Sequence, residues 1–385
     1  MDTKVYFNSF FSASIAIFVP LFIWGNTLSH IPWIFQKLEM NNSTLGYLFM
    51  IFSIVQLLFS QLSGRLIIPY LGSRTSLVIG LIVFSSTPIF FVFSNSITLF
   101  LFASVPAGIG IGIINTTATA VTSVAENKTK KILQTYYSAF FSLGILCGGL
   151  CSGLYRFLEL NSYILFFILI FFGLISSIFV FILGLKKQYD EIEKTKKFKL
   201  PENKLLIYSL YLFGFFATVT AIVDWAPLWF EKELFTTSLI ASLTIVCWFS
   251  GETISKFLGA TLIEKFNERV IGCYLPLFGS IIYLIIVLIG NYYFILVGLF
   301  ILGVATANFV PIIVRLALKS TTENVNTASA NLITLGFLGF LLGPAMIGYT
   351  SEIYSIHFNV IAISFLWILI FSTFLFVVRR FTKFK

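Results

Sequence analysis

Glu252 and Lys256 are the residues of this chain whose types and spacing most directly suggest chemistry. They stand four positions apart in an otherwise apolar run, residues 237–257, so one turn of a helix separates them. An ionisable side chain inside such a run is costly to bury and is a functional candidate by default. A coupling role would require Glu252 to bind and release a proton. The alternative is structural: the two charges pair so that the helix can insert, and Lys256 extends to the membrane surface.

Three further ionisable residues are candidates. Asp224 lies beside two tryptophans, which an interfacial aromatic belt would explain. Asp224 itself is favoured as an external gate or cap over a substrate ligand. The intrinsic pKa of a histidine side chain would permit a proton relay at His30, although a structural hydrogen bond is the simpler role. Glu126 ends a polar stripe on one helical face that includes Asn115, Thr119 and Thr122. The candidates for proton coupling or gating are Asp224, Glu252, Lys256, Glu126 and His30.

Neutral polar and aromatic residues within apolar runs form a second group. Amides, hydroxyls and aromatic faces suit hydrogen bonding and stacking with a polar, mostly uncharged solute such as a sugar-like molecule. The first, second, fourth and fifth runs contain no deep arginine or lysine, which disfavours a phosphate or dicarboxylate. The candidate substrate-binding residues are Trp24, Asn26, Gln56, Asn115, Thr119, Tyr136, Tyr137, Asn308 and Asn331.

The elements that must position these residues are membrane-spanning helices. Hydrophobic residues make up 58% of the chain and charged residues only 11%. About 20 helical residues cross the hydrocarbon core, and continuously apolar runs of that length exclude strands. The sequence therefore predicts an all-α polytopic membrane protein of twelve transmembrane helices. The expected spans are residues 7–29, 43–61, 76–93, 99–124, 132–154, 162–185, 205–223, 237–257, 270–289, 293–318, 328–350 and 358–378.

The distribution of positive charge predicts the orientation. With both termini in the cytoplasm, only Lys37, Arg156 and Lys232 fall in external segments, as the positive-inside rule requires. The same distribution accounts for the net charge of +9 without nucleic-acid binding. The first span follows a short tail with Lys4 and lacks a cleavage site, so we expect it to be retained.

The chain also repeats itself. Residues 185–204 form the one long charged stretch, and it divides the spans into six and six. We therefore expect an N-terminal bundle over 1–184, a cytoplasmic basic linker over 185–204 and a C-terminal bundle over 205–385. An offset of 195 residues aligns prolines and glycines of the two halves, which predicts parallel repeats. The aligned pairs include Pro32 with Pro227, Gly108 with Gly303, Gly144 with Gly339, Gly148 with Gly343 and Gly153 with Gly348.

Six-plus-six parallel repeats with a basic central loop resemble the major facilitator superfamily. Residues 64–74 are similar to its gating-loop signature but carry Ile68 and Pro69 in place of the acid, whereas the equivalent residues 259–269 keep Glu264. Other stretches resemble the YbjJ-like subgroup of bacterial inner-membrane proteins, although the chain lacks that subgroup's acids near Val219 and Asn115. These stretches are residues 26–32, 108–126, 138–144, 223–226 and 336–352.

The resemblance implies a secondary active transporter of the bacterial inner membrane. It would work by alternating access of two bundles, coupled to protons, as a symporter for the polar solute. A lipophilic drug/proton antiporter and a non-transporting receptor of the same fold are the alternatives. We expect no enzyme activity, because phosphate-binding loops and His-rich metal clusters are missing and only His30 and His357 are present. We also expect no cofactor or metal, packing roles for the four cysteines, contact with membrane lipids and a monomer.

Overall fold

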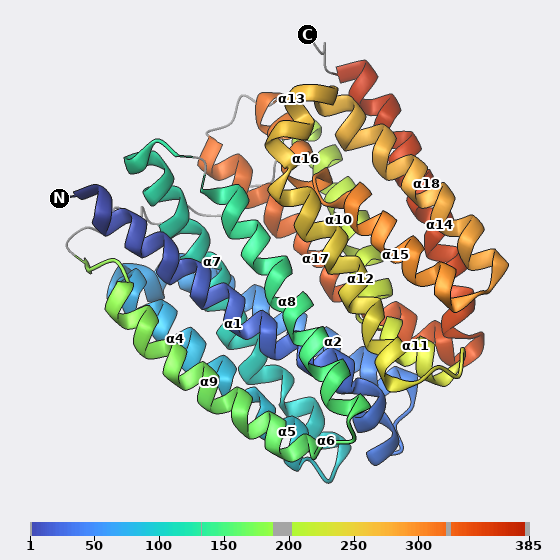
Figure 1. Cartoon of the computed structure of the whole chain (residues 1–385). Helices are drawn as coiled ribbons and strands as arrows, with labels where there is room; N and C mark the ends of the chain where they lie inside the picture. Colours follow the sequence, from blue (N-terminus) through green and yellow to red (C-terminus); the bar gives the residue numbers. More distant parts are fainter. Residues whose placement is uncertain (1, 132, 188–201, 321–324, 382–385) are drawn as a thin grey trace.

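The computed structural model describes residues 2–131, 133–187, 202–320 and 325–381, and these residues form a bundle of long helices without any strand (Figure 1). In the first half the helices are α1 (Asp2–Lys37), α2 (Asn42–Leu62), η1 (Ser63–Ile67), α3 (Ile68–Leu71), α4 (Ser73–Ser85), α5 (Thr87–Phe93), α6 (Ile97–Phe102), α7 (Ser104–Thr129), α8 (Gln134–Phe157) and α9 (Ser162–Leu183). In the second half they are α10 (Asn203–Val223), α11 (Ala226–Lys232), α12 (Ser238–Phe257), α13 (Gly259–Arg269), η3 (Val270–Tyr274), α14 (Leu275–Ile289), α15 (Tyr292–Thr306), α16 (Phe309–Ser320), α17 (Val325–Ile353) and α18 (Ile356–Phe381).

The helices account for the predicted spans. Among the described residues, eleven helical stretches are long and apolar enough to cross a membrane. The remaining predicted span, 328–350, lies within the 29-residue helix α17. The span predicted at 76–93 is divided into α4 and α5, where Pro88 near the start of α5 offers no N–H to continue the hydrogen bonding of α4. The all-α prediction is confirmed.

The start of α1 and the end of α18 lie at the same end of the bundle, which we call the termini side (Figure 1). The short helices α5, α6 and α11 lie at the other end, which we call the opposite side. The chain between Asp2 and Lys37 crosses from the termini side to the opposite side in one continuous helix.

Each half of the bundle packs mainly on itself. Helix α1 packs along α8, α7 and α9, and α10 packs along α17, α16 and α18. The halves meet where α8 lies against α12, where α2 lies against α17, and where α1 approaches α11. The basic linker expected at 185–204 lies for the most part outside the described residues.

Glycines make the same close contacts in both halves. A Cβ atom on Gly144 of α8 would come within 2.6 Å of the carbonyl oxygen of Phe18 on α1. In the second half, a Cβ atom on Gly339 of α17 would clash with the carbonyl oxygen of Phe213 on α10. Both partners of the second contact lie 195 residues after those of the first. The repeated contact shows two pseudo-symmetric bundles in which small residues let helix backbones approach closely.

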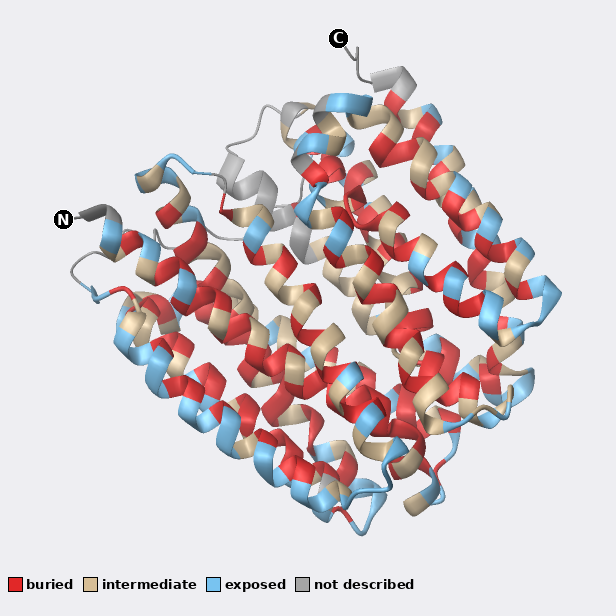
Figure 2. Cartoon of the chain, viewed as in Figure 1, coloured by how far each residue is buried: buried red, intermediate tan, exposed pale blue. Residues whose placement is uncertain are grey.

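The outer helices expose apolar surface. On α9, Phe171 and Ile182 are more than 60% exposed, and α14 and α18 carry comparable residues such as Ile289 and Phe376. Buried residues concentrate between the helices, and exposed residues follow the outward faces (Figure 2). This arrangement is the one expected of outer helices that face lipid.

Candidate functional site

Glu252 and Lys256 form an ion pair on α12. The Lys256 ammonium lies 2.6 Å from Oε1 of Glu252, and the two side chains are 13% and 17% exposed. The sequence predicted one helical turn between them, which is the spacing that lets oppositely charged side chains meet. Both the structural and the coupling interpretation of the pair require this contact.

Lys256 also reaches from the second half to the first. Its ammonium donates a hydrogen bond to the Ser142 hydroxyl at 2.9 Å and lies 3.5 Å from the Ser138 carbonyl oxygen, both on α8. The Phe141 ring of the same helix lies 5.7 Å from the ammonium. The charged pair therefore stands at the contact between the two bundles, which its position in the sequence alone did not reveal.

Polar residues of α7 and α8 contact one another at Tyr137, which directly precedes Ser138 in the sequence. The Tyr137 hydroxyl lies 3.4 Å from Oδ1 of Asn115, and Thr119 also hydrogen-bonds this tyrosine. Its neighbour Tyr136 is half exposed, and its ring packs 6.1 Å from that of Phe257 on α12. The structure therefore brings together Asn115, Thr119 and Tyr137 of the predicted substrate-binding set.

Gln56 lines a gap between α2 and α17. Ser53, Leu57, Phe337 and Phe340 complete this gap, whose volume of about 10 Å³ leaves room for no more than one water molecule. The Ser53 hydroxyl donates a hydrogen bond to the carbonyl oxygen of Phe340, so the two halves are bonded here as well.

Several predicted site residues are bonded to neighbouring protein groups. The amide of Asn26 donates to the Phe22 carbonyl on its own helix. Asn308 donates to both the carbonyl and the hydroxyl of Ser255, which connects the break between α15 and α16 to α12. Glu126 accepts from the first backbone amides of the α8 region, at Leu133 and Gln134, and so caps that helix.

Trp24, His30 and Asp224 have different surroundings. The Trp24 ring stacks on Phe52 of α2 at 4.7 Å. Nδ1 of the buried His30 lies 2.6 Å from the Ser152 hydroxyl, which joins α1 to α8. Asp224 follows the last residue of α10 and is partly buried. The side chain of the remaining candidate, Asn331, lies outside the described part of the chain.

A set of contacts across the halves closes the opposite side. Arg156 at the end of α8 forms a bidentate ion pair with Glu231 of α11, with distances of 2.5 and 3.0 Å, and also donates to the Ser29 carbonyl. Nearby, Lys232 donates to Oδ1 of Asn42. The backbone amide at position 43 donates to Glu352 at 3.1 Å.

These residues were not among the predicted site residues. The available signal was that Arg156 and Lys232 are two of the three cations assigned to external segments. Nothing in a single sequence pairs Arg156 with a glutamate 75 residues away. Only the packing of both α8 and α11 against α1 and α12 brings the two side chains together.

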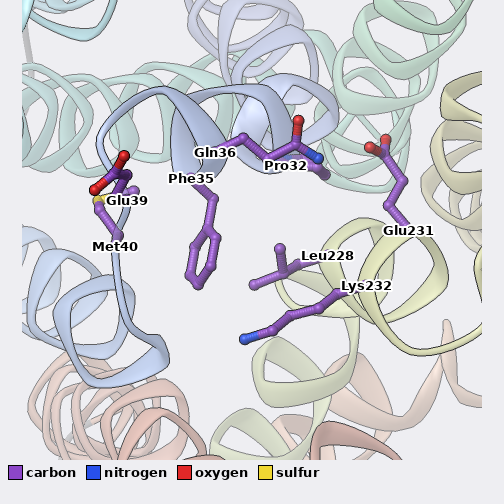
Figure 3. Close-up of a pocket in the computed structure, with 8 residues that line it drawn as sticks. All are labelled: Pro32, Phe35, Gln36, Glu39, Met40, Leu228, Glu231 and Lys232. Carbon is purple, nitrogen blue, oxygen red and sulfur yellow. The ribbon is translucent and has the colours of Figure 1, made fainter.

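A cavity of about 270 Å³ lies beside these contacts. Phe35, Leu228 and Lys232 point toward one another between the end of α1 and α11 (Figure 3). The remaining lining residues are Pro32, Gln36, Glu39, Met40 and Glu231. The Lys232 ammonium lies 4.8 Å from the centre of the Phe35 ring, which adds a cation–π contact between the halves.

The described residues contain no group of three or more His, Cys, Asp or Glu side chains arranged to hold a metal ion. Cys273 is buried and the other three cysteines are partly buried, and all four are free thiols. The site around Lys256 is thus made of one ion pair, hydroxyls, amides and aromatic rings at the contact of two helical bundles.

These features define a polytopic helical membrane protein with a charged pair between two pseudo-symmetric halves. A sequence model of the Major Facilitator Superfamily matches residues 13–246, which is more than half of the chain. The chain therefore belongs to the major facilitator superfamily of membrane transporters.

Relatives and solved structures agree with this assignment. An uncharacterized MFS-type transporter of Yersinia pestis is 20% identical over 329 residues, which cover 85% of this chain and 84% of that protein. Multidrug resistance protein 2 of Bacillus subtilis is 28% identical over 133 residues, 34% of this chain and 33% of that protein. The crystal structure of the nucleoside transporter NupG superposes over the full length of both chains with a TM-score of 0.72 and 15% identity. The human organic anion transporter MFSD10 has a TM-score of 0.70 and 16% identity, covering 96% of this chain and 99% of that one.

Proposed function

We propose that this protein is a secondary active transporter that moves a small polar solute through the contact between its two bundles by alternating access. The observation that carries the proposal is the position of the contacts between the halves. The opposite side is closed by the Arg156–Glu231 pair and the bonds around Lys232, whereas Lys256, in the last turn of α12, binds α8 nearer the termini side. Polar contacts at separate depths are what a carrier needs to close first one side and then the other.

The proposed solute is polar and mostly uncharged, such as a sugar-like molecule. Support comes from Asn115, Thr119 and Tyr137, which offer an amide and hydroxyls, and from Gln56 and Tyr136 at the contact between the bundles. Such groups fix the orientation of a solute by hydrogen bonding, and aromatic faces pack against its carbon skeleton. Transport without an enzymatic step and without a cofactor is part of the proposal.

We propose that the protein works as a monomer in a bacterial inner membrane, with both termini in the cytoplasm. The basis is the bias of Lys and Arg toward the termini side. The opposite side then faces outward, and the described conformation is closed to the exterior. Protons are the proposed coupling ion, with Glu252 as the group that carries the proton and Asp224, Glu126 and His30 as further candidates.

Transport assays with purified protein in liposomes test the proposal. We expect uptake of at least one labelled polar solute, and stronger accumulation when the lumen is made alkaline relative to the outside. Protein-free liposomes provide the baseline, and a proton-conducting ionophore should remove the accumulation. A protein that binds a solute in thermal-shift assays but never moves it would be a receptor of the same fold, and the transport proposal would be withdrawn.

Export of lipophilic drugs is a second candidate function. Two multidrug resistance proteins of Bacillus subtilis are among the relatives, at 28% and 27% identity over about a third and two fifths of their lengths. Efflux of a hydrophobic fluorescent cation from loaded vesicles distinguishes this function from uptake of a polar solute.

A further inference from the structure

Building on the proposed transport function, but departing from its uncharged solute, we propose that the transported solute carries a single carboxylate, that Lys256 binds this carboxylate in place of Glu252, and that Glu252 takes up one proton in the exchange. The solute would then be a polyhydroxy monocarboxylate, and each molecule would cross with one proton. Three observations carry this inference: the geometry of the pair, its absence from the other half of the repeat, and the balance of buried charge.

The geometry leaves Lys256 able to change partners. Its ammonium already lies between a carboxylate on its own helix, 2.6 Å away, and hydroxyl and carbonyl oxygens on α8 at 2.9 and 3.5 Å. An ammonium has three donors on a flexible stem, so it can turn toward a solute between α8 and α12 without moving the helix. The Ser142 hydroxyl that it now contacts can donate a second hydrogen bond to the incoming carboxylate.

The fold does not require this pair. Helix α2, at Asn42–Leu62, corresponds to α12 under the 195-residue offset, and it carries Leu57 and Gln61 at the positions of Glu252 and Lys256. Helix α2 packs against α17 much as α12 packs against α8. Because one helix of the repeat packs across the halves without charges at these positions, helix packing alone does not account for the charges on the other.

The balance of charge links the solute to a proton. As described, the pair is neutral. A carboxylate that took Lys256 would leave the Glu252 carboxylate without its partner in a site where both side chains are more than four-fifths buried. An uncompensated buried charge is strongly destabilising. One proton bound to a Glu252 oxygen restores neutrality, and its release when the solute leaves lets the original pair form again.

No other described charged residue competes for this role. Besides α8, helix α12 packs against α15, α11, α1, α13 and α10. Helix α15 contains no charged residue and no histidine, and the only charged residue of α8, Arg156, is paired on the opposite side. The remaining described titratable groups lie at helix ends or are tyrosines and cysteines. They are Lys4, Tyr6, His30 and Lys37 on α1, Lys204, Tyr208 and Tyr211 on α10, Asp224 directly after α10, Glu231 and Lys232 on α11, Lys265, Glu268 and Arg269 on α13, Tyr292 and Tyr293 on α15, Tyr136, Tyr137, Cys147, Cys151 and Tyr155 on α8, and Cys247 on α12.

The neighbouring groups suit the rest of such a solute. Tyr137 precedes Ser138 on α8 and is bonded to Asn115 and Thr119, which can hydrogen-bond hydroxyl groups. A single ammonium matches one carboxylate, whereas a dicarboxylate or phosphate would need further positive charge.

The test compares probes that differ in charge. D-gluconate is the carboxylate, and sorbitol and L-alanine are the uncharged and zwitterionic counterparts; each is measured for thermal stabilisation of the purified protein and for uptake into liposomes. We expect D-gluconate alone to stabilise the protein, with an apparent Kd that rises about tenfold per pH unit once Glu252 is ionised, because one proton binds with each anion. Absence of D-gluconate binding would overturn the inference. Transport of sorbitol or L-alanine in that case would leave the proposed function standing.

Two variants locate the effect. Glu252→Gln should bind D-gluconate with little dependence on pH and should lose accumulation driven by a pH gradient, while exchange down a D-gluconate gradient persists. The double variant Glu252→Gln/Lys256→Gln leaves no unpaired charge, so it should fold, yet it should bind D-gluconate at least tenfold more weakly. Lys204→Gln, an exposed change of the same type at the start of α10, is the matched control. Unaltered D-gluconate affinity in the double variant, or unaltered accumulation in Glu252→Gln, would overturn the inference.

Discussion

Arg156 shows how much one residue decides at the contact between the halves. Its guanidinium makes two hydrogen bonds to Glu231 and one to the Ser29 carbonyl, so it connects α8 both to α11 in the second half and to α1 in its own. Both partners of the ion pair are only 12% exposed. A planar guanidinium held in this way is more specific than an ammonium, so lysine would not replace it fully.

Replacing Arg156 by Gln should open the opposite side. The change leaves the Glu231 carboxylate without its positive partner in a site that is largely shielded from water. Only the closed conformation contains the pair, so this conformation is destabilised, by about 3 kcal/mol. A cysteine at position 228, beside the cavity, should then react faster with a membrane-impermeant maleimide in a background without other cysteines. The double variant Arg156→Gln/Glu231→Gln should recover part of the closure. Equal labelling rates in all three proteins would show that the pair does not hold this side closed.

At the scale of helices, glycines set the distance between α1 and α8 and between α10 and α17. A Cβ atom on Gly148 would clash with the Phe22 carbonyl oxygen, and one on Gly343 would clash with the carbonyl oxygen of Ala217. These contacts with backbone atoms cannot be relieved by rotating a side chain. The helices pack closely without the hydrophobic effect that drives packing in water.

Gly148→Leu should therefore force α1 and α8 apart. We expect a loss of about 1–3 kcal/mol, typical of overpacking, measured as a lower unfolding midpoint in detergent. Leu150→Ala is the control, because that side chain is on the same helix and is 38% exposed. A similar fall in both variants would mean that close approach of α1 and α8 contributes no special stability.

At the scale of the whole molecule, the orientation of the bundle follows from helices that alternate in direction. The start of α1 and the end of α18 share the termini side, and Lys187 after α9 donates to the Tyr70 carbonyl next to the start of α4. Glu159, in the turn between α8 and α9, belongs to the opposite side. The positive-inside rule assigns the termini side to the cytoplasm.

Labelling of single cysteines in intact cells tests this orientation. Cysteines at positions 4 and 187 should react with an impermeant reagent only after the membrane is broken, because their sites face the cytoplasm. A cysteine at position 159 should react in intact cells, which controls for reagent quality. Reaction of positions 4 and 187 on different sides would contradict an even number of spans between them.

The sequence by itself determined the helices, their approximate ends and the repeat of the halves. Lipid offers no hydrogen bonds, so each span must be an apolar helix of fixed minimum length, and that constraint is local. The i, i+4 contact of Glu252 with Lys256 could be predicted for the same reason, since both residues lie on one helix.

Only the tertiary structure decided which polar groups meet across helices. In the folded protein Lys256 is hydrogen-bonded to α8 and Arg156 pairs with Glu231. Asn308 and Glu126 bind neighbouring protein groups that a single sequence cannot identify. Such pairings depend on the rotation and depth of each helix against its neighbours, which are set by close packing at positions such as Gly144 and not by hydropathy.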